Sequence, residues 1–85
     1  MNAAERFGAN LQSIRAKSGI SQEELANLSS VHRTQVGDLE RGVGQPRLET
    51  IVKLAGGLGV DPCELIYGIR WVPAASTKTG EFEIA

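Results

Sequence analysis

Residues 21–42 read SQEELANLSSVHRTQVGDLERG, and this segment predicts two short helices joined by a turn. Ser21 stands three positions before Glu24, the spacing at which each side chain bonds the backbone N–H of the other residue at a helix start. The apolar residues then recur at helical rather than strand spacing. Within the two segments these apolar residues are Leu25, Ala26, Leu28, Val36 and Leu39.

The same start and stop signals recur on both sides of this segment. Asn2 with Glu5, and Asp61-Pro62 with Glu64, repeat the capping pattern, so we expect three helices to begin with a capping box. Glycines follow the helical segments, where a left-handed residue without a Cβ is favoured. They are Gly19, Gly42, Gly59 and Gly68. These signals predict an all-α fold, a compact five-helix domain within residues 1–68.

Residues 69–85 follow a different period, which predicts a C-terminal extension folded as a β-hairpin. Ile69 and Trp71, and then Phe82 and Ile84, alternate with polar or charged neighbours. An isolated hairpin is marginally stable unless something packs on it. Trp71, Phe82 and Ile84 therefore either cover the domain's own core or pack against a second subunit, and the pattern leaves both interpretations open.

The composition of the chain limits the classes of function that it could have. A chain of 85 residues with short apolar runs and one cysteine offers one domain, no disulfide framework, no signal peptide and no membrane span. His32 and Cys63 have no metal-ligand partners at the usual spacing, so we expect no metal and no cofactor. Cys63 itself is expected to be a small semi-buried residue; the alternative is a redox sensor, whose thiol pKa the positive end of the helix would lower. We find no nucleophile–base pair, and predict that the protein is not an enzyme.

The formal net charge of −1 is unusual for a protein that binds nucleic acid, because a basic patch is the usual electrostatic signature of such proteins. Residues 1–72 alone hold eight basic and eight acidic side chains. Binding to DNA would therefore depend on where the charges lie rather than on their sum, with weak, salt-sensitive non-specific affinity.

Several motifs together carry a family resemblance: SQEELA at 21–26, VHRTQV at 31–36 and LERG at 39–42, followed by apolar residues at helical spacing up to residue 60. Over about residues 5–68 the chain resembles the helix-turn-helix domain of phage repressors and Cro proteins, the XRE family of regulators. Residues 31–42 are especially similar to the controller proteins of restriction–modification systems. One departure is Ser30, where the family usually has glycine; a left-handed conformation costs such a residue roughly 1–2 kcal/mol.

The resemblance implies a DNA-binding site in which the third helix enters the major groove. Arg33, Thr34 and Asp38 would face the bases, and Asp38 would either accept from cytosine or orient Arg33. Gly37 would let the helix approach the DNA more closely, or is merely tolerated. His32 would be a surface or N-cap residue or a phosphate contact. The residues implied at the DNA backbone or groove edge are Gln22, His32, Gln35, Arg41 and Arg47. An internal ion pair is implied between Arg15 and Glu40, and the alternative is a DNA contact by Arg15.

These observations predict a sequence-specific regulator of transcription that binds double-stranded DNA. We expect a homodimer on a palindromic operator, acting as a repressor or autoregulator in the cytoplasm of a bacterial or phage-type system, at the nucleoid. No segment long enough to sense a small-molecule effector is evident, and no membrane partner is expected. The alternative is an antitoxin-like or other protein-interaction module whose C-terminal tail, residues 69–85, binds a partner.

Overall fold

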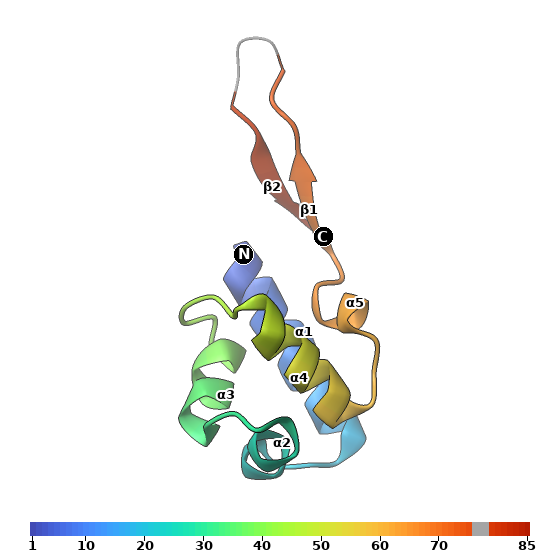
Figure 1. Ribbon diagram of the computed structural model, residues 1–85. Coiled ribbons are helices and arrows are strands. Elements are labelled where there is room, and N and C mark those ends of the chain that lie inside the picture. Colours follow the sequence, from blue (N-terminus) through green and yellow to red (C-terminus); the bar gives the residue numbers. More distant parts are fainter. Residues whose placement is uncertain (76–78) are drawn as a thin grey trace.

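The computed structural model describes residues 1–75 and 79–85, and within them the chain forms five helices followed by a two-stranded antiparallel hairpin (Figure 1). The helices are α1 (Ala3–Ser18), α2 (Gln22–Ser29), α3 (Arg33–Glu40), α4 (Leu48–Leu58) and α5 (Pro62–Leu65), and the strands are β1 (Ile69–Val72) and β2 (Glu81–Ile84). The predicted all-α fold with a C-terminal hairpin is confirmed. Among the described residues, no helix has the length and apolar character needed to cross a membrane.

Capping boxes fix the starts of α1 and α2, as their sequences predict. The Asn2 side chain accepts from the backbone N–H of Glu5 at 2.8 Å, and the Glu5 carboxylate accepts from the N–H of Asn2 at 2.9 Å. Ser21 and Glu24 make the same reciprocal pair at 3.0 and 3.1 Å. Each box satisfies two backbone donors that the helix itself leaves without partners.

The prediction of a third capping box, at the start of α5, is wrong. Asp61 accepts instead from the backbone N–H of Cys63, at 2.9 Å. The N–H of Glu64, which a box would use, donates to the backbone carbonyl of Asp61 at 2.9 Å. Because α5 has only four residues, that carbonyl takes the donor in a single tight turn, and the carboxylate bonds one residue earlier.

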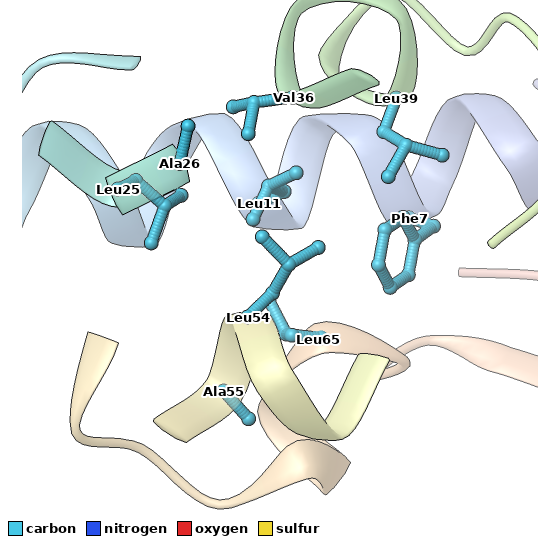
Figure 2. Packing of buried hydrophobic residues seen from close by; sticks show 9 residues of the cluster. All are labelled: Phe7, Leu11, Leu25, Ala26, Val36, Leu39, Leu54, Ala55 and Leu65. Carbon is cyan, nitrogen blue, oxygen red and sulfur yellow. The ribbon is translucent and has the colours of Figure 1, made fainter. Parts of the chain in front are cut away.

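The hydrophobic core lies between the five helices, with α1 running through its centre (Figure 1). Leu11 of α1 has no exposed surface and lies between Val36 of α3 and Leu54 of α4 (Figure 2). Each helix contributes at least one buried side chain, so removing any helix would open the core. The buried apolar residues are Phe7, Leu11, Leu25, Ala26, Val36, Leu39, Leu54, Ala55 and Leu65.

Two glycines allow helices to approach each other more closely than any larger residue would. A Cβ on Gly8 of α1 would lie 2.2 Å from the carbonyl oxygen of Leu39, near the end of α3. A Cβ on Gly57 of α4 would lie 2.2 Å from the hydroxyl of Ser29 in α2. These approaches hold α3 against α1 and α4 against α2.

The hairpin has one apolar and one mostly polar face. Its register pairs Ile69 with Ile84 and Trp71 with Phe82, so these four side chains share a face. The opposite face carries the pairs formed by residues 70 with 83 and 72 with 81, including an exposed ion pair between Arg70 and Glu83 at 3.4 Å. The hairpin projects from the end of the domain opposite α2 (Figure 1).

Polar side chains of α1 attach the hairpin's base to the helical domain. Asn10 donates to the carbonyl oxygens of Leu65 and Tyr67, both at 2.9 Å. Arg6 donates to the carbonyl of Tyr67 at 3.3 Å and to that of Ala85 at 2.9 Å. The base of the hairpin is therefore fixed in place, whereas its outer part extends beyond the helices (Figure 1).

Candidate nucleic-acid interface

The turn between α2 and α3 sets the angle at which α3 leaves the domain. Ser30 ends α2 in a left-handed conformation, with φ 55° and ψ 42°, and is the only non-glycine residue with positive φ in the part of the chain described. The N–H of Val31 then bonds the carbonyl of Ala26 at 3.1 Å. Ala26 before the turn and Val36 after it are both buried, so the helices on either side of the strained serine are fixed in the core.

The start of α3 presents two side chains to solvent. Arg33 and Thr34 are both exposed, and neither makes a side-chain hydrogen bond within the described residues. His32 is the N-cap residue of α3, exposed and without a side-chain capping bond. A guanidinium and a hydroxyl on the first turn of a solvent-facing helix are donors suited to guanine edges and other base edges.

An ion pair between α1 and α3 lies directly behind this helix. Arg15 donates to both carboxylate oxygens of Glu40, at 2.5 and 3.0 Å, and to the carbonyl of Ile20 at 2.9 Å. The Glu40 side chain is only 5% exposed. The hydrogen bond to Glu40 raises the pKa of Arg15, with burial opposing it and the carboxylate's charge adding to it. The pair is internal, and it fixes the end of α3 against α1.

Glu40 also holds the first residue of α2. The side-chain amide of Gln22 donates to Glu40 at 3.0 Å, on the oxygen that also accepts from Arg15. One of the two amide N–H groups of Gln22 is thereby used, and the other is left for a further acceptor. No pattern within α2 alone indicated this contact, because Glu40 lies 18 residues away.

Gly37 is buried beneath side chains rather than facing outward. A Cβ at this position would lie 3.3 Å from the guanidinium of Arg41 and 3.6 Å from the side-chain oxygen of Gln22. The missing side chain leaves room for Gln22 and Arg41, which cover α3 here.

Asp38 pairs with Arg41, one turn further along α3, and not with Arg33. The ion pair joins an Asp38 oxygen to the Arg41 guanidinium, and the two side chains are 40% and 64% exposed. The carboxylate that was expected to reach a base or to orient Arg33 therefore neutralises a residue expected at the DNA backbone. Exposed pairs of this kind are weak and exchange readily.

The loop after α3 carries the remaining expected backbone contacts. Gly42 and Gly44 have positive φ, and the N–H of Val43 returns to the carbonyl of Asp38 at 2.9 Å. Arg47 is the exposed N-cap residue of α4 and makes no side-chain capping bond. Gln35 is half-buried on α3. Arg33, Arg41 and Arg47 thus occur along one continuous stretch of chain, from the start of α3 to the start of α4.

Cys63 differs from expectation. It is exposed rather than semi-buried, and its pKa is raised rather than lowered. The Asp61 carboxylate raises the pKa of the thiol, first through a hydrogen bond and then through its negative charge. The acid that caps α5 thus outweighs any effect of so short a helix.

Comparison with known proteins identifies this arrangement. A model of the helix-turn-helix family, HTH_3, matches residues 11–65, which include α2, the Ser30 turn and α3. The chain belongs to the helix-turn-helix family. It is an XRE-type member of this family of DNA-binding regulators of transcription, and the match ends before the hairpin.

This helix-turn-helix protein is similar to control proteins of restriction–modification systems, as the sequence of residues 31–42 predicted. It is 43% identical to the control protein C.BamHI of Bacillus amyloliquefaciens, over 71% of this chain and 75% of that protein. It is 35% identical to the control protein C.SmaI of Serratia marcescens, over 78% of this chain and 79% of that one. The crystal structure of the restriction-modification controller protein C.AhdI from Aeromonas hydrophila matches with a TM-score of 0.72 and 44% identity, covering 73% of this chain and 94% of that chain.

Proposed function

We propose that this protein is a sequence-specific transcriptional regulator that reads double-stranded DNA with α3. The observation that carries the proposal is the exposure of Arg33 and Thr34 on the first turn of the second helix of a helix-turn-helix unit. In this motif that helix lies in the major groove and its N-terminal residues contact base edges. Arg33 would donate two hydrogen bonds to guanine, the commonest specific contact, and Thr34 would bond a base or touch a thymine methyl.

The remaining polar residues position the protein on the DNA backbone. Gln22, held by Glu40 at the start of α2, would donate its second amide hydrogen to a phosphate, with support from the helix N-terminus. The same DNA strand, or the strand paired with it, would be contacted by His32, Arg41 and Arg47. Asp38 would have to exchange Arg41 for a base donor before it could read cytosine.

We further propose that the regulator acts as a homodimer on a palindromic operator, because one helix of eight residues offers few base contacts. The likeness to control proteins supports a role as repressor or autoregulator of a restriction–modification gene set. Selection of bound sequences from a random pool tests both points: a two-fold symmetric site is expected. An unsymmetrical site, or no enrichment, contradicts the proposal.

Variants of α3 and its flanks then separate base reading from backbone contact. Arg33→Ala should lose discrimination at one base pair in each half-site, by ~1–3 kcal/mol. Arg47→Ala should weaken operator and random DNA alike, if it contacts phosphate. Lys17→Ala removes a positive charge from α1, where Lys17 lines a groove with Cys63 and Tyr67, and serves as the matched control. Equal losses on operator and random DNA for Arg33→Ala would refute base reading by this residue.

A further inference from the structure

The outer part of the hairpin's apolar face is uncovered. Ile69 packs against the core and Ile84 is half-buried, but Trp71 and Phe82 are 58% and 57% exposed. Their rings contact each other edge to face, with centroids 5.1 Å apart. Since a two-stranded hairpin with one face in water is marginal, this aromatic pair calls for a surface that covers it.

A second apolar surface begins where the hairpin does. A groove of about 160 Å³ lies between the start of α1, the loop before α4, and α4 itself. Phe7, Ile51, Ile66 and Ile69 line it, and Ile69 also belongs to the apolar face of the hairpin. The groove and the aromatic pair are therefore parts of one continuous surface.

The rim of the groove adds exposed apolar side chains on α4 and just after α5. Leu48 precedes the groove residue Ile51 by one helical turn and is 78% exposed, and Val52, four residues after Leu48, is 50% exposed. Ile66, in the groove wall, is 45% exposed. Exposed apolar residues in one contiguous patch mark interaction surfaces.

The exposed area of the aromatic pair indicates what kind of surface covers it. Aromatic side chains bury ~150–250 Å² each, so the exposed halves of Trp71 and Phe82 supply roughly 200 Å² per chain. Two hairpins packed only on each other would fall well short of the ~1,200 Å² of a stable interface. The aromatic pair must therefore lie against a larger apolar surface, and this chain carries one at the hairpin's base.

We infer that a second copy of this chain covers the surface, with the Trp71–Phe82 pair of each protomer packed against the groove and rim of its partner. A two-fold axis brings the aromatic pair of each chain onto the groove of the other, so both surfaces are buried twice and the contact area doubles. The hairpin lies at the end of the domain opposite α2 (Figure 1), so this contact leaves α3 accessible. Glu81 and Glu83 on its other face disfavour DNA as the occupant. The inference rests on the proposed dimeric function and names its interface.

Trp71 is the chain's single tryptophan, so the wild-type protein reports on its own interface. Sedimentation equilibrium of the full chain gives the mass over a range of concentrations, and fluorescence with acrylamide quenching gives the exposure of Trp71 over the same range. We expect dimer formation, a blue shift and reduced quenching to follow one dissociation constant. A chain that stays monomeric at all accessible concentrations, or a dimer in which Trp71 remains fully quenchable, overturns the inference.

Charge insertion on the aromatic face provides the second measurement. Phe82→Glu should raise the dimer dissociation constant at least ~100-fold and abolish the concentration-dependent blue shift, while circular dichroism shows unchanged helix content. Tyr67→Glu is the matched control, since Tyr67 is an aromatic residue, 71% exposed, outside the hairpin; it should dimerise like wild type. Wild-type affinity in Phe82→Glu overturns the inference.

Binding to the selected operator separates this inference from the proposed function. A chain that dimerises with Trp71 buried but binds no DNA sequence preferentially refutes the proposed function and leaves the interface standing. A chain that binds a palindrome as a dimer while Trp71 stays exposed supports the function and overturns the interface.

Discussion

Replacing Ser30 with glycine should stabilise the domain. Ser30 holds φ 55° and ψ 42°, a conformation that costs a residue with a Cβ roughly 1–2 kcal/mol. Glycine removes that cost but loses more backbone entropy on folding, by roughly 0.5–1 kcal/mol. The Ser30 side chain is exposed and makes no hydrogen bond within the described residues, so no contact is lost. The expected net gain for Ser30→Gly is about 0.5–1 kcal/mol.

Urea denaturation followed by far-UV circular dichroism measures the free energy of unfolding, with the slope m unchanged if only stability has altered. In a domain of this size, 1 kcal/mol corresponds to a shift of about 4–8 °C in Tm. Ser30→Ala keeps the strain and removes only the hydroxyl, so its stability should stay near wild type.

Gly59→Ala tests the same cost in the opposite direction. Gly59 ends α4 with φ 70° and ψ 30°, and a Cβ there would meet no atom within 4 Å. A strain of roughly 1–2 kcal/mol, less an unfolded-state entropy gain of roughly 0.5–1 kcal/mol, should leave Gly59→Ala destabilised by about 0.5–1 kcal/mol. The reasoning is refuted if Gly59→Ala is destabilised as expected while Ser30→Gly is no more stable than Ser30→Ala.

Two further predictions concern close packing and the thiol. Gly8→Ala would place a Cβ 2.2 Å from a backbone oxygen of α3, so its free energy of unfolding in urea should fall by ~1–3 kcal/mol or more. Gly56→Ala has open space around it and should be more stable than wild type by up to ~1 kcal/mol, because alanine has the higher helix propensity. Similar stabilities for the two variants would contradict this account. Since Asp61 raises the pKa of Cys63, the thiolate fraction at neutral pH is low; alkylation by iodoacetamide should be slow there, and its rate should rise with pH and level off only above the ordinary thiol pKa. Asp61→Asn should lower that pKa and speed the neutral-pH reaction, and an unchanged rate–pH profile would argue against the assignment.

Local signals in the sequence anticipated most of the fold. The capping boxes at Asn2 and Ser21 depend on residues three positions apart, so they are visible without the tertiary structure. The left-handed Ser30 followed from its place in the motif, and the hairpin followed from the alternation of Trp71 and Phe82 with charged neighbours. At Asp61 the local pattern was the same, but a one-turn helix used the donor differently.

The candidate site was less predictable, because its contacts join distant segments. Gln22 bonds Glu40, 18 residues away, and no periodic pattern encodes such a pair. The cover over Gly37 by Gln22 exists only once α2 has packed on α3. The Asp38–Arg41 pair joins α3 to its C-cap residue, and its spacing of three residues, which a helix brings together, made it predictable from the sequence.

The Asp38–Arg41 ion pair bears on how such a regulator would search a chromosome. On any DNA sequence, Arg41 reaches a phosphate only by leaving Asp38 or by carrying that carboxylate toward the phosphate backbone. This cost is the same at every site, whereas only the operator offers base contacts that offset it. Because an exposed pair of this kind is worth up to about 1 kcal/mol, it would weaken binding at every site by up to about fivefold and leave the ratio between operator and non-target DNA unchanged.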